Sequence, residues 1–584
     1  MAATVLMLTA CSDPAPEIPP LDRAKLALER HDGLGAEIIL RDMAARGTPM
    51  AEIAAFLGQA ELQQNQLGAA RRWLENAAFT PETRGLGHHM LGRVEMAEGH
   101  LPKAGMAFDR ALETMPDNPE LWVDIGRLRY LGGEQKQAIE ASIHAFELGP
   151  DNVAALEFRA QLIRDSDGLE AALPLYEAAL ERHPDSLTLL GDYAATLGET
   201  GNARDMLTIA RRMIELDEGN SRAIFLQAVL AARGSEFGLA RNLLIRSGNL
   251  ERGSPAALML SGIIDMQQGN YASASQALDR LERLQPDNQR IRLLAARCLA
   301  LGGRHRELVH RFGDRAMLPG SSPYLATLVG RSYEALGERD HAAPFLDSAA
   351  KPRSNALRPM QTDIPLDVAL SRGPRTGGDA VALVRGLIGA GQTGAAIANA
   401  EAFLARVPGS GDALALAGDA YLAAGQGGQA ADYYAQAAAI RSSWPLTRRM
   451  VAAELTAGRT LSGLTLLEHQ LANNSGNPEA AIMLARAELA KRNAQKAALL
   501  LDLAIANGAS RDPGAQMLRA RAAMAMGEME VARMAAIRAY SLQRMNPAAT
   551  ALLAEILAQT SASSGAEAAQ SQALARKAAI LSAR

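Results

Sequence analysis

The sequence is poor in cysteine, lysine and aromatic residues, and each shortage excludes a class of protein. Its 584 residues include two cysteines, Cys11 and Cys298, which are too few for a disulfide framework or a four-cysteine metal site. Aromatic residues make up only 4% of the chain, which favours helices packed through small side chains over a β-sandwich or barrel. Only seven of the 60 basic residues are lysines, so 53 arginines carry the basic chemistry.

The charge balance and the absence of catalytic motifs exclude further functions. The net charge of -4 provides no positive excess for nucleic acid, so no nucleic-acid partner is predicted. The sequence contains no HExxH zinc motif, GxSxG elbow, GxxxxGK phosphate loop or EF-hand loop. We therefore predict no enzyme, no metal and no cofactor. The alternative is an enzyme whose site is assembled from neighbouring repeats without a linear motif.

Three residues of metal-binding type are predicted to be structural. His88 and His89 are neighbours and would point about 100 degrees apart on a helix, so they are predicted to pack or to face solvent rather than to chelate. Cys298 lies in an apolar stretch, residues 293–301, and is predicted to be a small core residue rather than a reactive thiol.

The first twenty residues predict a membrane anchor. The run Leu8-Thr9-Ala10-Cys11 resembles a bacterial lipobox, in which a cysteine becomes lipidated, although no Lys or Arg precedes Cys11. Residues 12–20 are proline-rich and read as a tether. The resemblance implies a lipid on Cys11 and a periplasmic chain, and Ser12 resembles outer-membrane rather than inner-membrane sorting signals. A frayed terminus with a chance cysteine, and hence a cytoplasmic chain, is the alternative.

Turn residues recur every 34 residues over most of the chain. The first series of positions holds Asn65, Gly99, Gly133, Asp167, Gly201, Ser235, Gly269, Gly303 and Gly337. The next turn glycine, Gly391, follows after 54 residues, and the period then resumes with Gly425, Arg459, Asn493 and Gly527, although Gly458 precedes one of these positions by one residue. These fourteen positions predict fourteen helical hairpins, each turning at a residue that ends a helix.

Two further residue types keep the same frame. Alanine stands five residues after the turn in most copies, where a small residue lets the paired helices approach closely. These alanines are Ala70, Ala104, Ala138, Ala172, Ala240, Ala274 and Ala342. Proline stands seventeen residues after the turn in the clearest copies, where it ends one hairpin before the next begins. These prolines are Pro116, Pro150, Pro184 and Pro286.

The combined pattern, complete in residues 119–150, resembles the tetratricopeptide repeat family over residues 51–560. The resemblance implies an all-α chain, a right-handed α-solenoid of about fourteen hairpins whose first helices line a concave groove. The step to Gly391 exceeds the period by 20 residues, and the extra material lies in residues 351–378, whose four prolines cannot continue stacked hairpins. These prolines are Pro352, Pro359, Pro365 and Pro374. We therefore predict an anchor and tether at 1–20, a solenoid at 21–350, an insertion at 351–378, a second solenoid at 379–560, and a linker with a terminal helix at 561–584.

Arginine is enriched at one position of the first helices, six residues before the turn. The six residues, which we call the arginine ladder, are Arg93, Arg127, Arg297, Arg331, Arg385 and Arg521. The frequency of arginine in the chain accounts for only about one of fourteen positions by chance. Because the family's first helices face the groove, the ladder is predicted to bind an acidic peptide or an anionic polysaccharide through bidentate arginine contacts. A solvated helix face is the alternative.

The order of lipobox, tether and repeats resembles tetratricopeptide-repeat lipoproteins associated with exopolysaccharide production and export in Gram-negative bacteria. This resemblance implies a non-enzymatic scaffold, anchored through Cys11, that recruits protein partners of an envelope machine. A cytoplasmic adaptor or assembly chaperone that binds peptide segments is the alternative from another class. The sequence names neither the partner nor the polymer, because a fold alone does not fix function.

Overall fold

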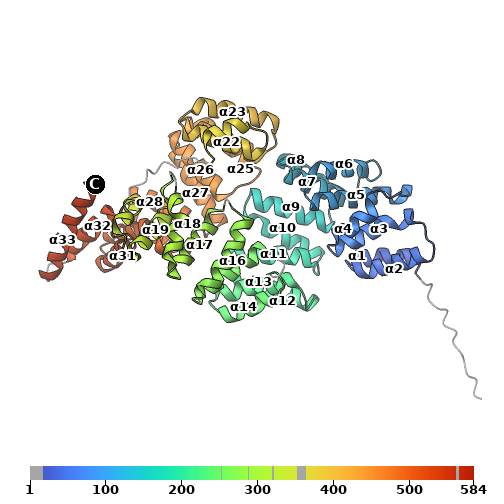
Figure 1. Ribbon diagram of the computed structural model, residues 1–584, viewed down its shortest axis with the longest axis horizontal. Helices are drawn as coiled ribbons and strands as arrows, with labels where there is room; N and C mark the ends of the chain where they lie inside the picture. Colours follow the sequence, from blue (N-terminus) through green and yellow to red (C-terminus); the bar gives the residue numbers. More distant parts are fainter. Residues whose placement is uncertain are drawn as a thin grey trace, which may run out of the picture. The chain divides into compact units, whose positions relative to one another are not determined.

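The computed structural model describes residues 18–250, 253–286, 288–318, 321–350, 364–560 and 565–583. These residues form 33 α-helices and one short 3-10 helix, and none of them is in a strand (Figure 1). The prediction of an all-α chain is therefore confirmed. Cys11 and most of the predicted tether lie outside the described residues.

The chain divides into two compact units, Met1–Arg159 and Ala160–Arg584, which are described separately. The first unit contains the helices drawn in blue to cyan in Figure 1. These are α1 (Pro20–Glu29), α2 (Gly33–Ala45), α3 (Met50–Gln63), α4 (Leu67–Leu74), α5 (Pro81–Ala97), α6 (Leu101–Leu112), α7 (Pro119–Leu131), α8 (Gln135–Leu148) and the first half of α9 (Val153–Ser166).

The second unit begins within α9 and contains the remaining helices. Before the gap at residues 351–363 these are α10 (Leu169–Arg182), α11 (Leu187–Thr200), α12 (Ala203–Leu216), α13 (Ser221–Arg233), α14 (Phe237–Arg246), α15 (Pro255–Gln267), α16 (Tyr271–Leu284), α17 (Gln289–Leu301), α18 (His305–Met317), α19 (Pro323–Ala335) and α20 (Arg339–Ala350). After the gap they are α21 (Leu366–Arg372), α22 (Gly377–Gly389), α23 (Thr393–Arg406), α24 (Gly411–Ala423), α25 (Gly427–Ala438), α26 (Trp444–Thr456), α27 (Thr460–Asn473), α28 (Pro478–Ala490), α29 (Ala494–Ala506), η1 (Ala509–Arg511), α30 (Pro513–Ala525), α31 (Met529–Leu542), α32 (Pro547–Thr560) and α33 (Gly565–Ser582).

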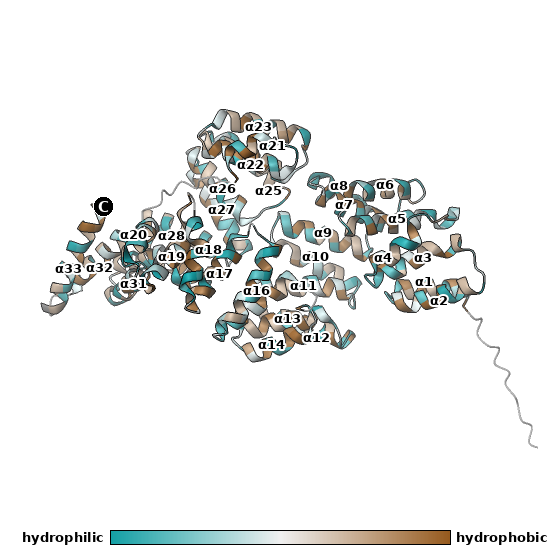
Figure 2. Cartoon of the chain, in the orientation of Figure 1, coloured by the Kyte–Doolittle hydropathy of each residue, from teal (hydrophilic) through white to brown (hydrophobic). Residues whose placement is uncertain are grey.

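The hairpin of α7 and α8 shows how the sequence produces one repeat. Asn118 caps α7 by accepting a hydrogen bond from the Leu121 backbone nitrogen at 2.9 Å, and Pro119 begins the helix with its fixed φ. Gly133 turns the chain at a φ of +85°, a conformation that costs glycine nothing. Ala138 is then fully buried between the paired helices. Brown and teal residues alternate along the helices of both units, as amphipathic helices require (Figure 2).

The fourteen predicted hairpins are present within the described residues, α3 to α20 and α22 to α31. The helices α1 and α2 form one more, which the prediction missed: its left-handed residue, His31, lies 34 residues before Asn65. Asn65 and Ser235 take the left-handed conformation, as do the turn glycines of the frame. Three predicted turn positions are off by one residue, because the left-handed residue is Gly168 rather than Asp167, Gly458 rather than Arg459, and Arg492 rather than Asn493. In each case the predicted residue lies next to the turn, and Asn493 instead caps α29.

The segment after the gap joins the second array of hairpins. Thr376 caps α22, and Ala369 of α21 belongs to the same apolar cluster as Leu383 and Leu387 of α22. At the other end, α33 follows as a final helix and its Leu574 packs into the cluster of α30 to α32. The predicted domain boundaries remain predictions, because residues 351–363 and 561–564 lie outside the described part of the chain.

Cys298 is a core residue, as predicted. Its side chain is fully buried in the apolar cluster of α15 to α20, and its sulfur lies 3.2 Å from the Tyr271 carbonyl oxygen. Burial, with the negative charge of Asp279 as a smaller cause, raises the pKa of the Cys298 thiol to about 11. A thiol of this kind is protonated at neutral pH and is a poor nucleophile. Among the helices of the described residues, none is long and apolar enough to cross a membrane.

Candidate binding surface

All six ladder arginines lie on first helices of hairpins. Their positions are Arg93 on α5, Arg127 on α7, Arg297 on α17, Arg331 on α19, Arg385 on α22 and Arg521 on α30. Because the turn after α28 is at Arg492, the equivalent residue of that hairpin is Arg486, which the regular 34-residue frame missed. The frame was misplaced there because this turn has Arg492, and not a glycine, as its left-handed residue. The surroundings of the ladder members differ, and these differences decide which of them is available to a ligand.

In the first unit, two ladder members pair with a buried carboxylate. Arg127 Nη1 lies 3.3 Å from Asp124 Oδ1 and Arg93 Nε lies 3.5 Å from Asp124 Oδ2. His89 Nε2 completes the cluster at 2.8 Å from Asp124 Oδ2. Burial opposes ionisation of Asp124, but the His89 hydrogen bond and the charges of both arginines outweigh it and lower the pKa of Asp124. His89 is therefore a packing histidine with a polar partner that the sequence analysis did not foresee.

Arg93 remains the more accessible of these two arginines. Its side chain is 41% exposed, whereas that of Arg127 is 32% exposed and also lies 3.8 Å from Glu157 Oε2. The Arg127 guanidinium in addition stands over the Phe158 ring, 5.8 Å from its centroid. Arg127 is thus committed to contacts within the chain, and Arg93 keeps part of its guanidinium for an external acceptor.

In the second unit, Arg385 lies beside a buried polar cluster. Asp419, on α24, occupies the ladder position of its own hairpin and is 1% exposed. Arg449 Nη1 lies 2.7 and 2.8 Å from its two carboxylate oxygens, and the Tyr434 hydroxyl donates to Oδ1 at 2.7 Å. Burial lowers the pKa of Arg385, an effect that the nearby Asp419 carboxylate partly offsets. The ladder is therefore interrupted by an acidic member, Asp419, which Arg449 pairs with and whose charge acts on Arg385.

Arg297 and Arg331 lie near another part of the same unit, and the Arg331 side chain also stays 41% exposed. Arg331 lines a small cavity together with Arg544, which follows α31. Burial, and then the positive charge of Arg511, lowers the pKa of Arg297. A hydrogen bond from Gln543 Nε2 to the Ala349 carbonyl oxygen (3.4 Å) joins the same two stretches. Another, from Asn473 Nδ2 to the Asp167 carbonyl oxygen (3.2 Å), joins α27 to the turn between α9 and α10. The sequence did not predict this contact. Arg521, by contrast, is exposed.

A second recurring position carries buried acids. Four residues before the turn, several first helices bury a carboxylate that a basic residue of an adjacent second helix pairs with. The pairs are Glu61 with Arg41, Glu95 with Arg71, Asp265 with Arg241, and Glu488 with Lys496. In the three arginine pairs the basic residue belongs to the preceding hairpin, so the pair ties consecutive hairpins together. An acidic residue four positions before the turn was the sequence signal that could have revealed this network.

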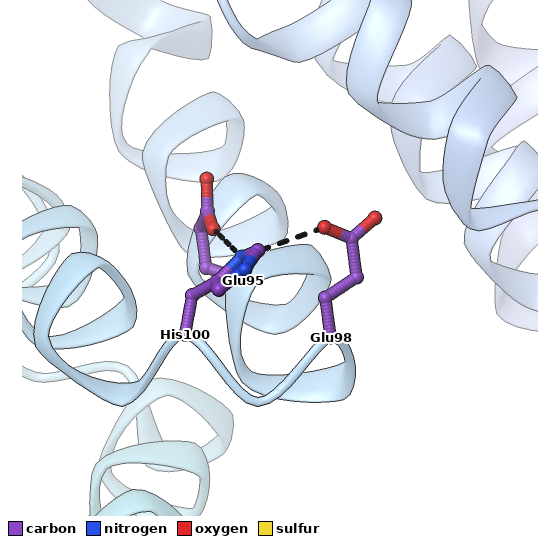
Figure 3. Close-up of side chains that lie close together, drawn as sticks. All are labelled: Glu95, Glu98 and His100. Carbon is purple, nitrogen blue, oxygen red and sulfur yellow. Dashed lines mark hydrogen bonds and ion pairs between the residues drawn. The ribbon is translucent and has the colours of Figure 1, made fainter.

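One of these acids belongs to a cluster that could in principle hold a cation. Glu95, Glu98 and His100 bring their ligand atoms within 4.8 Å of one another at the turn between α5 and α6 (Figure 3). His100 Nδ1 lies 2.9 Å from Glu95 Oε2 and 3.6 Å from Glu98 Oε2. Arg71 already pairs with both carboxylates, at 2.8 Å and 2.5 Å. A metal ion would have to displace this guanidinium, so the arrangement is an ion-pair network and we assign no metal site to it.

We expect acid to loosen the first unit through these carboxylates. The hydrogen bond from Arg71, opposed by burial, lowers the pKa of Glu95 below the ordinary 4.5, and the pKa of Asp124 lies below the ordinary 3.8. A group with a lowered folded pKa contributes stability above its unfolded pKa and loses it as the pH falls through the folded value. Hydrogen-exchange protection of α5 to α7, corrected for intrinsic rates, should therefore fall below about pH 4.5.

The variant Asp124→Asn provides the control, because an amide does not titrate. We expect it to lower the protection of α5 to α7 at pH 7, since Arg93 and Arg127 lose their charged partner, and to flatten the further loss of protection between pH 4.5 and 3. Unchanged protection of the wild-type helices down to pH 3 would contradict the assignment.

The chain is similar to known helical-repeat proteins. The tetratricopeptide repeat family model matches residues 260–307 and 381–444. A TPR repeat-containing protein of Pseudomonas aeruginosa is 26% identical over 206 residues, which cover 35% of this chain and 34% of that protein. Cellulose synthase 2 operon protein C of Komagataeibacter xylinus is 26% identical over 295 residues, which cover 47% of this chain and 21% of that protein.

The chain thus matches about a third and a fifth of the length of these two curated relatives. A solved tetratricopeptide repeat protein from Parabacteroides merdae is 19% identical, with a TM-score of 0.29, and its match covers 41% of this chain and 94% of that structure.

Proposed function

Because the chain carries tetratricopeptide repeats, we propose that it is a lipid-anchored scaffold of the bacterial envelope that holds protein subunits of an exopolysaccharide or other export machine. Tetratricopeptide repeats are protein-interaction modules, and the stacked hairpins supply a long row of first helices for such contacts. The lipobox-like run that ends at Cys11 supports the envelope location. The relative named for a cellulose synthase operon supports the link to a polysaccharide machine.

The observation that carries the binding role is the ladder on the first helices. Arg521 is exposed, and the Arg93 side chain stays 41% exposed beside its buried partner Asp124. Arg331 is equally exposed, but it pairs with Glu334 and lines a cavity with Arg544 of its own unit, and Arg127 is paired within the chain. An arginine fork of this kind grips a carboxylate with two parallel hydrogen bonds. We therefore propose that Arg93 and Arg521 contact acidic side chains of the protein partner, one from each unit.

Neutral substitution of these arginines should weaken partner capture. The variants Arg93→Gln and Arg521→Gln each lose a charge-assisted contact, for which we expect about a tenfold loss in the yield of cross-linked partner in the cell envelope. The yield is measured by chemical cross-linking in living cells, followed by mass-spectrometric identification of the captured protein.

Arg72→Gln on α4 and Arg538→Gln on α31 are matched controls, because both arginines are exposed on second helices and each variant makes the same change in charge. If the ladder variants and the controls fold and capture equal amounts of partner, Arg93 and Arg521 do not contribute to partner binding.

The repeats supply no positive sign of catalysis, and tetratricopeptide-repeat proteins are in general scaffolds. The proposal therefore assigns no reaction and no cofactor to this chain. The competing function, a cytoplasmic adaptor or assembly chaperone, uses the same repeats and differs in location, so evidence for lipidation of Cys11 separates the two.

A further inference from the structure

Four arginines of the second unit gather where two distant stretches of chain meet. Arg297 and Arg331 occupy the same position on two consecutive first helices, α17 and α19. Arg511 ends η1, between α29 and α30, and Arg544 lies between α31 and α32, so these two residues stand before and after the hairpin of α30 and α31. We call Arg297, Arg331, Arg511 and Arg544 the arginine seam. All four belong to the same compact unit.

The two sides of the seam touch. Arg331 and Arg544 line one small cavity together with Thr327 and Gln543. The Gln543 side chain donates a hydrogen bond to the Ala349 carbonyl oxygen beside it, at 3.4 Å. One hairpin away, the positive charge of Arg511 adds to burial in lowering the pKa of Arg297. Arg331 therefore lies beside Arg544 in one cavity, and the charge of Arg511 acts on Arg297 from the same opposite stretch.

Within the described residues the seam has too few acids to balance four guanidinium groups. Arg331 Nη1 pairs with Glu334 Oε2 at 2.6 Å. The Nε of Arg297 is buried and donates no hydrogen bond to a described residue. Among described residues, Arg511 and Arg544 make no ion pair, and the nearby Asp512 uses its Oδ1 to cap α30 through the Gly514 and Ala515 nitrogens. The seam thus holds an excess of positive charge.

Like charges that face each other across a contact raise its free energy. An oxyanion between them reverses the sign of this effect, because each guanidinium can offer two parallel hydrogen bonds to its oxygens. We propose that the arginine seam is an oxyanion site, which binds a phosphate or carboxylate group and thereby closes the contact between α17–α20 and the connections at Arg511 and Arg544. This site goes beyond partner binding by Arg93 and Arg521, and it is independent of the envelope location.

The site is tested on the full chain by titration with inorganic phosphate and, separately, with citrate, against potassium chloride of equal ionic strength. Isothermal calorimetry measures binding, and hydrogen exchange reports the contact in α19 and in residues 542–546. We expect saturable binding of at least one oxyanion, with added protection of both stretches that chloride does not reproduce. The two titrations distinguish a free phosphate from a carboxylate-bearing ligand as the natural occupant.

The double variant Arg511→Gln, Arg544→Gln should lose about tenfold or more in oxyanion affinity, because one side of the seam no longer supplies a fork. Both arginines are exposed, so folding should be retained. Arg538→Gln on α31 makes a like change outside the seam and should bind as the wild type does. Arg544→Lys keeps the positive charge but not the two parallel donors of a guanidinium. Its oxyanion affinity should lie between those of the wild type and the double variant.

Two results would overturn the proposal. The first is that neither oxyanion binds or protects the wild type beyond the effect of chloride. The second is that the double variant binds phosphate and citrate as tightly as the wild type. If the double variant protects the contact better without any anion and oxyanions leave the wild type unchanged, the seam is only a point of repulsion and holds no ligand site.

Discussion

Replacing Arg449 with Met should destabilise the second array of hairpins by about 3 kcal/mol or more at pH 7. Asp419 is 1% exposed, and Arg449 donates to both of its carboxylate oxygens. Without that guanidinium a buried carboxylate keeps only the Tyr434 hydroxyl as a direct donor, with the charge of Arg385 nearby. Urea unfolding followed by tryptophan fluorescence measures the loss in a background with Trp73→Phe and Trp122→Phe, in which the remaining tryptophan, Trp444, begins the same helix, α26.

Arg448→Met provides a matched control one residue away. Arg448 pairs with Glu479 at 3.1 Å, but that carboxylate is 56% exposed, and a pair of this kind is worth about 1 kcal/mol or less. The two variants remove the same group from neighbouring positions and differ in the burial of the acid left behind. Equal effects of the two substitutions would show that the Asp419 cluster is not buried in the folded chain.

Much of the fold could be predicted from the sequence, because turn residues recur at the same interval in many copies of the repeat. A single glycine is weak evidence for a turn, but glycine, asparagine or serine at a fixed interval identified the turns at Asn65, Gly133 and Ser235. Three turns were misplaced by one residue, because the interval varies locally while the frame was held at 34. The clearest example is Arg492, a left-handed residue that composition alone would not select.

The binding surface was less predictable, for a physical reason. Periodicity places Arg93, Arg127, Arg297 and Arg331 on first helices, but whether each is available depends on residues that the repeat does not specify. Asp124 lies within one repeat of Arg93 and Arg127. Arg511 and Arg544, by contrast, are more than 200 positions away along the chain from Arg297 and Arg331. Contacts between distant hairpins leave no periodic trace, and so the seam could be found only in the structure.

Substitution of Cys11 should have a large effect on where the chain is found in the cell. A lipid on Cys11 would hold the chain at the membrane, since each buried methylene contributes about 0.8 kcal/mol and several acyl chains act together. The variant Cys11→Ala removes the attachment atom and leaves the repeats unchanged. We expect it to shift the chain almost completely from the membrane fraction to the soluble fraction. Cys298→Ala is the control for the loss of a cysteine, because that thiol is buried in the core.

The most direct test of a lipid-anchored envelope scaffold is metabolic labelling with palmitate in a Gram-negative host, combined with fractionation and in-cell cross-linking of the wild type and Cys11→Ala. The account predicts a labelled wild-type chain in the membrane fraction, cross-linked to another envelope protein, and an unlabelled variant that is soluble and loses this partner. A wild-type chain that carries no label dependent on Cys11 and captures its partners in the cytoplasm would contradict it.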